Sequence, residues 1–262
     1  MSILRDGHWV QRLLLVMLAL LASAHVTAAG VPVNPVLIVE TGMHRSTFKI
    51  AVDHEERFFV SASGDKTIRV WDLPSGELKK VIRPPIGESN EGQLYDVALS
   101  PDGKLIAAGG RTAYQWDGES VVYLFDRESG EMVARTPGLP NIVRKLSWSP
   151  DGKFLAVALP KNHGLKVFDT EAWGEVFSDD TFTSNLPWVE FDAAGRMVAV
   201  ASNGRLRLYD TDFSVLAEDT VEIDAAPSSA RFSPDGSLIA IGFQQKTTVE
   251  VRSGTDLTFA YR

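Results

Sequence analysis

The sequence predicts an all-β protein, and three observations support this class. The first is a pair of short strands within Phe58–Asp72, where apolar and polar residues alternate at the period of a half-buried strand. The second is the segment Ser63–Lys66 between them, whose Ser, Gly and Asp are typical of a hairpin turn. The third is the return of this pattern along the chain. A period of about 45 residues is typical of the four-stranded blades of a β-propeller.

Four turns mark the repeats. Their first residues lie 49, 43 and 41 positions apart, and a related turn, Asp53–Glu56, begins 47 positions before the first of them. Three of the four read Ser-Pro-Asp-Gly, in which Pro presets φ, Asp bonds its own backbone and Gly accepts a positive φ. We therefore expect a propeller of five repeats, with blades at about 44–86, 92–140, 141–183, 184–224 and 225–262. The four turns are Ser100–Gly103, Ser149–Gly152, Asp192–Gly195 and Ser233–Gly236.

Composition excludes several function classes. The 262 residues include 34 acidic and 26 basic ones, and no basic stripe stands out, so we expect no nucleic-acid partner. The absence of Cys excludes disulfides, thiolate metal sites and a Cys nucleophile within this chain. His44, His54 and His163 lie in predicted loops without a matching ligand motif. We therefore expect no catalytic residue, no metal site and no cofactor.

The first 29 residues have a different character from the rest. Arg5 and Arg12 precede the apolar run Leu13–Ala22, which is too short to cross a membrane as a helix. Small residues follow at the spacing of a cleavage site, as in Ala22–Ala24 and Val26–Ala28. Residues 1–29 are therefore interpreted as a signal peptide and residues 30–262 as the propeller. An exported chain, periplasmic or secreted, without stable membrane insertion after cleavage is expected.

The repeats resemble WD40 repeats, and the first blade shows the likeness most clearly. In that family a Trp on the third strand, a Ser or Thr on the second, a turn Asp and a preceding His form a hydrogen-bonded brace. Trp71, Ser61 and Asp65 occupy the matching positions, so the resemblance implies that they form a structural brace. His44 lies one residue out of register. Later blades replace the Trp by Phe or Tyr, and the fifth has Val251–Arg252 in place of the aromatic-Asp pair.

A second resemblance concerns Arg83–Gly92 and Gly109–Ser120. This pairing is similar to the propeller region of bacterial proteins that join WD40 repeats to a caspase-like peptidase domain. In such proteins the peptidase supplies a His and a Cys, and this chain has no Cys, so the resemblance implies a sensor or docking part without the peptidase. Propellers have about 4–8 blades. A five-repeat module and an incomplete propeller both remain open, with Val36–Glu40 as an additional predicted strand.

One connection departs from the repeat pattern. Gly109–Gly118, between the second and third strands of the second blade, is longer than its counterparts. It carries Arg111, Tyr114 and Trp116, and Tyr, Trp and Arg are enriched at binding hot spots. In this topology the connection shares a face with the loops that join successive blades. Together with Arg83, these three residues are the predicted partner-binding residues.

Two loops are expected to flank Tyr114 and Trp116, namely Arg83–Glu91 and Pro137–Asn141. The alternative is that the two aromatic side chains fold back over a neighbouring blade and serve only as local packing.

The sequence thus predicts an exported, non-enzymatic propeller that binds a protein or peptide as a scaffold or sensor module. The alternatives are an extracytoplasmic propeller enzyme or ligand-binding protein with a site in the central channel, or a fragment of a caspase-like peptidase. Carboxylates or histidines that converge within metal-ligand reach would favour the enzyme. An apolar and aromatic patch with a polar rim would favour docking.

Overall fold

The computed structural model describes residues 47–221 and 225–261, which belong to one compact unit, Met43–Arg262. The predicted signal peptide, the strand predicted at Val36–Glu40, and His44 lie outside the described residues. Among the described residues, no helix is long and apolar enough to cross a membrane.

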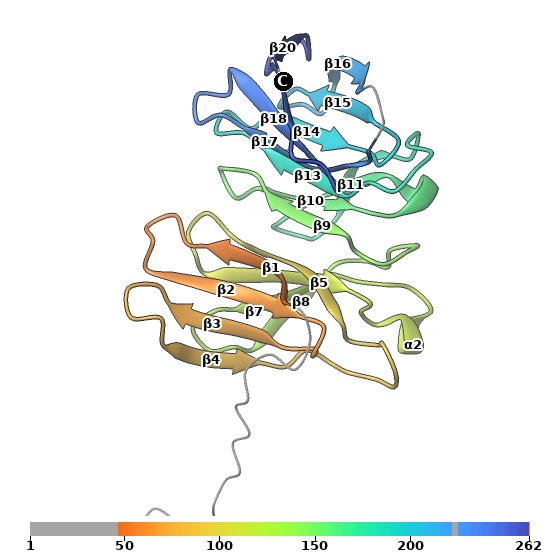
Figure 1. Ribbon diagram of the computed structural model, residues 1–262. Coiled ribbons are helices and arrows are strands. Elements are labelled where there is room, and N and C mark those ends of the chain that lie inside the picture. Colours follow the sequence, from red (N-terminus) through yellow and green to blue (C-terminus); the bar gives the residue numbers. More distant parts are fainter. Residues whose placement is uncertain (1–46, 222–224, 262) are drawn as a thin grey trace, which may run out of the picture. The chain divides into compact units, whose positions relative to one another are not determined.

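The described residues form five sheets, each with four antiparallel strands in chain order (Figure 1). The predicted all-β fold of about five four-stranded blades is therefore confirmed. The first two sheets contain β1 (Thr47–Val52), β2 (Phe58–Ser63), β3 (Ile68–Asp72) and β4 (Leu78–Ile82), then β5 (Leu94–Leu99), β6 (Leu105–Gly110), β7 (Tyr123–Asp126) and β8 (Met132–Arg135). The third contains β9 (Lys145–Trp148), β10 (Phe154–Ala158), β11 (Leu165–Asp169) and β12 (Glu175–Asp179). The last two contain β13 (Trp188–Phe191), β14 (Met197–Val200), β15 (Arg205–Tyr209) and β16 (Val215–Thr220), then β17 (Pro227–Phe232), β18 (Leu238–Phe243), β19 (Val249–Ser253) and β20 (Phe259–Tyr261).

The core lies between successive sheets. The central strands are buried on both faces, as in β14, where all four residues are buried. Apolar clusters join one sheet to the next: Val60 of β2 packs in the same cluster as Ile106 of β6, and Leu208 of β15 in the same cluster as Ile241 of β18. One blade alone would leave these faces in water, so the stacking of neighbours stabilises each sheet.

The innermost strands of successive sheets lie side by side, with β1 beside β5, β5 beside β9, β9 beside β13 and β13 beside β17. The outermost strands are mostly exposed, as the pattern of β16 illustrates. The loops that begin and end the inner strands are therefore carried by sheets that pack against one another.

The Ser-Pro-Asp-Gly turns close through their own side chains. In the first, the Ser100 hydroxyl donates to Asp102 Oδ1 at 2.6 Å and accepts from the Leu105 N–H at 2.9 Å. Gly103 takes a φ of 70°, which favours glycine. The turns at Ser149 and Ser233 repeat these contacts. They serve as hairpin turns, as their sequence predicts.

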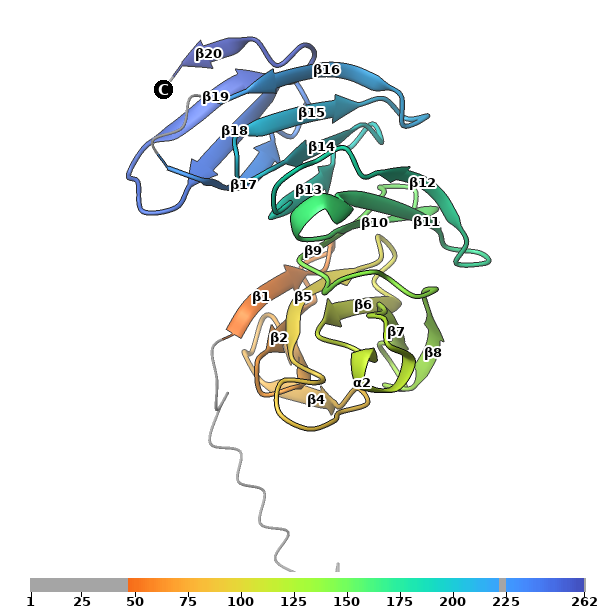
Figure 2. The same cartoon turned by 90° about the vertical axis from the view of Figure 1, so that its right-hand side faces the viewer.

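Two short helical segments interrupt the strand pattern. One is α2 (Tyr114–Asp117), between β6 and β7 (Figure 2), and the other is the 3₁₀ turn η1 (Lys161–His163). The sequence pattern predicted neither. α2 lies in the long connection of the second blade, where the partner-binding residues were expected.

Candidate binding surface

The long connection of the second blade is closed at both ends of α2. Ala113 and Gly118, on either side, have left-handed backbones with φ of 67° and 72°. The N–H of Asp117 donates to the Ala113 carbonyl at 2.9 Å, and that of Gly118 donates to the Tyr114 carbonyl at 3.0 Å. The Tyr114 side chain is 58% exposed. Tyr114 therefore does not pack over a neighbouring blade, and its ring is free for contact with another molecule.

The loop that joins the first two blades is fastened to α2. The Glu88 N–H donates to Gln115 Oε1 at 3.0 Å, and Gln115 Nε2 donates back to the Glu88 carbonyl at 3.3 Å. At Gly87 a Cβ would lie 2.1 Å from Gln115 Oε1, so a larger residue at position 87 would have to displace the Gln115 amide. Lys66 Nζ also donates to the Gly87 carbonyl at 2.9 Å. The loop is held in place by contacts from two directions.

The loop that joins the second and third blades lies on the other side of α2. Ser120 and Leu139 exchange backbone hydrogen bonds of 3.0 and 2.7 Å, and the Val143 N–H donates to the Gly110 carbonyl at 3.0 Å. These bonds fix the segment Pro140–Ile142 between them. The structure thus brings together the three segments whose proximity the sequence predicted.

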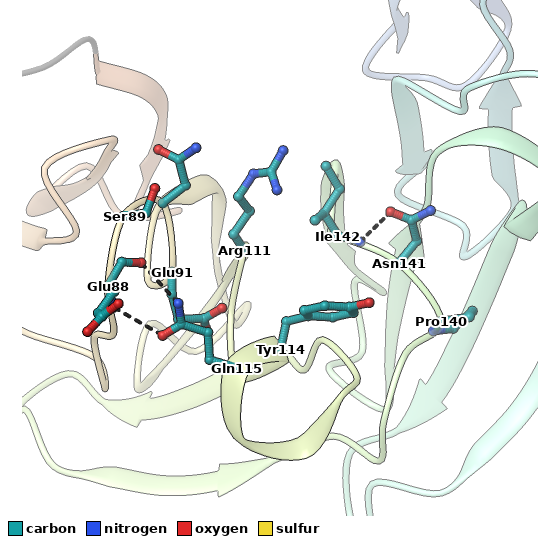
Figure 3. Close-up of a pocket in the computed structure, with 10 residues that line it drawn as sticks. Glu88, Ser89, Glu91, Arg111, Tyr114, Gln115, Pro140, Asn141 and Ile142 are labelled. Atoms are coloured by element: carbon teal, nitrogen blue, oxygen red, sulfur yellow. Dashed lines mark hydrogen bonds between the residues drawn. The ribbon is translucent and has the colours of Figure 1, made fainter.

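The three segments enclose a cavity of about 470 Å³, named the loop pocket here (Figure 3). In Figure 3 the Tyr114 ring extends from α2 toward Asn141, with Glu88 and Gln115 at the other end. Arg111 and Tyr114, two of the predicted binding residues, both line it. The lining residues are Glu88, Ser89, Asn90, Glu91, Arg111, Tyr114, Gln115, Pro140, Asn141 and Ile142.

Aromatic and basic side chains continue from the loop pocket onto the neighbouring surface. Arg111 is exposed, and its Nε donates to the Tyr95 hydroxyl at 2.9 Å. The Tyr95 ring lies 5.4 Å from the Phe48 ring and 5.7 Å from the Arg144 guanidinium carbon. Phe48, Tyr95 and Arg144 line a second hollow next to the loop pocket, and Asn90 lines both. This combination of aromatic surface and polar rim is typical of protein-binding sites.

Two predicted binding residues are placed differently. Arg83 follows the last residue of β4, is exposed, and is not among the residues that line the loop pocket. The backbone of Trp116 belongs to α2, and its side chain lies outside what the structure describes. Sequence reasoning missed Glu88, Glu91 and Gln115, which line the pocket. Only their position in the two irregular segments could have indicated them.

The three residues of the expected brace fall into two separate clusters. Trp71 Nε1 donates to the Ser61 hydroxyl at 2.9 Å, and the Trp71 ring stacks on Phe59 at 5.8 Å. The Asp65 carboxylate instead accepts from Thr67 Oγ1 at 2.6 Å and from Arg69 Nη1 at 2.9 Å. Burial would raise the pKa of Asp65, but hydrogen bonds from Thr67 and Arg69 hold it below its usual value. These contacts lie within the first blade.

The innermost strands also bring cations around one indole ring. Lys49 Nζ, Lys145 Nζ and the Arg231 guanidinium carbon lie 4.5, 4.8 and 5.4 Å from the centre of the Trp188 ring. They come from β1, β9 and β17, and Trp188 comes from β13. Burial lowers the pKa of Lys49, partly offset by Asp96. This arrangement stabilises the inner face through cation–π contacts.

The carboxylates of the inner face are paired with these cations. Glu190 Oε1 accepts from Arg231 at 3.0 Å, and Asp96 Oδ2 from Lys145 at 3.2 Å. Burial raises the pKa of Glu190 despite the neighbouring Arg231. Across residues 47–221 and 225–261, no three His, Cys, Asp or Glu side chains lie close enough together to hold a metal ion. The convergence of ligands that would favour a channel enzyme is not found in this part of the chain.

Two segments of the chain match a family model of known proteins. The family model described as "WD domain, G-beta repeat" matches residues 40–72 and 83–117, and the second segment includes both α2 and the loop of Glu88 and Glu91. Together with the five four-stranded sheets, this match supports a WD40 β-propeller. The likeness to bacterial propellers joined to a caspase-like peptidase stays a prediction.

Several curated proteins are similar to this chain. Pre-mRNA-processing factor 19 of Oryza sativa subsp. japonica is 28% identical over 202 residues, which cover 74% of this chain and 36% of that protein. The small ribosomal subunit protein RACK1 of Caenorhabditis elegans is 30% identical over 131 residues, 50% of this chain and 36% of that protein. The target of rapamycin complex subunit wat1 of Schizosaccharomyces pombe is 27% identical over 186 residues, 70% of this chain and 55% of that protein. The chain spans about a third to a half of the length of these relatives.

Proposed function

We propose that this chain of WD40-type blades is a non-enzymatic scaffold that binds a protein or peptide through the loop pocket and the adjoining surface. One observation carries the proposal: Tyr114 is 58% exposed on a helical turn that is hydrogen-bonded to the loop of Glu88, in a connection whose Gly110 and Ser120 bond the loop on the other side. An exposed aromatic side chain on a rigid support loses little conformational entropy when it is buried by a partner. Such a residue is typical of a binding hot spot.

The names of two relatives support a role in assembly. One is a small ribosomal subunit protein and another is a subunit of the target of rapamycin complex, and both names describe components of larger assemblies. Because the similarity covers only a part of each relative, we carry over the class of activity, protein binding, and not a particular partner. The net charge of −8 supports a protein rather than a nucleic acid as the partner.

The test compares two tyrosines of equal exposure. Tyr114 and Tyr261 are both 58% exposed, but Tyr261 lies on the outermost strand of the last sheet. A photoreactive benzophenone amino acid at position 114 would capture the partner from an extract of the source cells. Its Kd would then be measured by calorimetry for the unmodified chain and for Tyr114→Ala and Tyr261→Ala.

We expect Tyr114→Ala to weaken binding by about tenfold or more, the effect of truncating a hot-spot side chain. Tyr261→Ala should bind as the unmodified chain does, and both variants should keep its melting temperature. Equal Kd values for all three proteins would refute the proposed surface. A Tyr114→Ala variant that melts well below the Tyr261→Ala variant would also refute it, because Tyr114 would then be a structural residue.

We further propose that the scaffold acts outside the cytoplasm. The support is the sequence of residues 1–29, with two arginines before the apolar run Leu13–Ala22 and small residues after it. Expression of the full chain followed by cell fractionation and N-terminal sequencing would test the proposal. A chain that stays in the cytoplasm with residues 1–29 attached would refute it.

A further inference from the structure

The loop pocket contains a buried carboxylate that the partner-binding residues do not satisfy. Glu91 lines the pocket, yet only 5% of the residue is exposed. Its backbone is fixed on both sides, because its N–H donates to the Glu88 carbonyl at 3.0 Å and its carbonyl accepts from the Gly87 N–H at 3.4 Å. Its Oε1 is buried, and no hydrogen-bond donor of the described residues reaches it. One oxygen of the Glu91 carboxyl group is thus held in the wall of the pocket without a hydrogen-bond donor.

An unpaired buried carboxylate is unfavourable. Its transfer from water costs several kcal/mol unless a cation or hydrogen-bond donors replace the lost solvation. Arg111 lines the same pocket, but its Nε donates to the Tyr95 hydroxyl, and it forms no ion pair with Glu91. Natural proteins retain such locally unfavourable groups mainly at functional sites. The geometry therefore indicates a function for Glu91 that a ligand completes.

The other groups of the pocket suit an organic cation. The Tyr114 ring is exposed on the same cavity, and the face of an aromatic ring attracts ammonium and guanidinium groups. Glu88 adds a second carboxylate to the lining. No group of three metal-ligating side chains occurs among the described residues, so a metal ion fits the pocket less well. The volume of about 470 Å³ lies within the range of pockets that enclose a ligand group.

We propose that the loop pocket binds an arginine or lysine side chain of the partner, with its cationic group at Glu91 and its apolar stem along the Tyr114 ring. The inference rests on the proposed function and names the chemistry that the partner presents. Arginine has five N–H donors in a planar fork, which matches a carboxylate, and its plane stacks on an aromatic ring. Lysine offers a single ammonium group on a flexible stem.

The experiment uses the full chain and four labelled pentapeptide mixtures. The outer positions are randomised, and the central residue is arginine, lysine, citrulline or norleucine, of which the last two are uncharged counterparts of the first two. Binding is measured by fluorescence polarisation for the unmodified chain, for Glu91→Gln and for Glu131→Gln. Glu131 is an exposed residue of the second blade outside the pocket lining, so its replacement makes the same chemical change without touching the site.

We expect the arginine or the lysine mixture to bind at least about tenfold more tightly than its uncharged counterpart. Glu91→Gln should abolish this difference, and Glu131→Gln should preserve it. In the absence of peptide, Glu91→Gln should melt at the same temperature as the unmodified chain or higher, because it replaces a carboxyl group whose buried Oε1 accepts no hydrogen bond.

Three results would overturn the proposal: equal binding of charged and uncharged mixtures, a charge preference that survives Glu91→Gln, or a clear fall in melting temperature for Glu91→Gln. The last would mean that Glu91 stabilises the fold. Failure of this proposal and of the proposed function can be told apart. If Tyr114→Ala weakens capture of the natural partner and Glu91→Gln does not, the surface is a docking site and the cation assignment is wrong. If neither variant weakens capture, both proposals are wrong.

Discussion

Replacement of Asp179 by Ala would test how strongly the third and fourth blades are joined. The Asp179 side chain is only 6% exposed and forms an ion pair with Arg207 of the next blade. It also accepts from the Tyr209 hydroxyl at 2.5 Å and from Thr181 Oγ1 at 2.7 Å. The replacement therefore leaves a guanidinium and a phenol without their acceptor at a buried interface between sheets.

The structure gives the size of the effect. Breaking a buried ion pair costs about 3–5 kcal/mol. Arg207 keeps a second partner, because its Nε donates to Glu218 Oε2 at 2.6 Å. We therefore expect Asp179→Ala to lower the free energy of unfolding by about 2–4 kcal/mol. For a chain of this size the melting temperature should fall by roughly 4–16 °C.

Urea unfolding followed by tryptophan fluorescence would measure this difference. Asp180→Ala is the matched control, since the neighbouring Asp180 is exposed and its replacement should leave stability nearly unchanged. If Asp179→Ala and Asp180→Ala unfolded at the same urea concentration, the contacts across the third and fourth blades would not contribute to stability as described.

The same variant has an expected pH dependence. Burial alone would raise the pKa of Asp179, but hydrogen bonds from Tyr209, Thr181 and Arg207 outweigh it and hold the pKa below its usual value. A carboxyl group with a lowered folded pKa stabilises the protein fully above its unfolded pKa, near about 3.9, and loses that contribution as the pH falls through the folded pKa. The stability gap between the unmodified chain and Asp179→Ala should thus be constant near neutral pH and shrink below about pH 4. A gap that stays constant into acid would contradict the assignment of the effect to the ionised carboxylate.

Two further predictions concern the turns and the first blade. Gly103→Ala should be more destabilising than Gly195→Ala by about 1 kcal/mol or more. Both glycines have a positive φ, but only at Gly103 would a Cβ come close to another atom, at 2.7 Å from Asp53 Oδ1. Equal urea midpoints for the two variants would contradict this clash. Ser61→Ala should lower the free energy of unfolding by about 1 kcal/mol, since Trp71 Nε1 loses its acceptor, and the loss should vanish when Trp71 is first replaced by Phe. A double-mutant cycle by urea unfolding measures this coupling, and independent effects would refute it.

The regular parts of the fold could be predicted from the sequence because their determinants are local. Alternation in Phe58–Asp72 and the Ser-Pro-Asp-Gly turns give strands and hairpins directly, and their period gives the blade. α2 could not be predicted, because it begins after Ala113, which has a φ of 67° that no local propensity favours. The contact between Asp179 and Arg207 joins two blades, and the two residues are 28 positions apart in the sequence. No pattern in the sequence indicates that they form a pair.

Part of the candidate site could be predicted, because that part depends on local features of the sequence. The irregular length and the residue types Arg, Tyr and Trp pointed to Gly109–Gly118, and Arg111 and Tyr114 line a pocket. Glu91 was not foreseen, since a Glu in a polar loop usually faces solvent. Its burial arises from the approach of the loop of Glu88 to Gln115, which depends on two segments of different blades.

The separation of framework and pocket has a consequence for how substitutions should act. The sheets are held by ladder hydrogen bonds and by apolar clusters between blades, and the lining of the loop pocket belongs to connections outside these ladders. Substitution of a buried residue such as Asp179 should therefore change stability and leave the chemistry of the pocket intact. Substitutions of Glu91 and Tyr114 should do the reverse, because one residue has a buried carboxyl oxygen without a hydrogen-bond donor and the other an exposed ring. A residue whose removal costs binding without costing stability is the sign of a site built for a ligand, since a purely structural residue contributes to both or to stability alone.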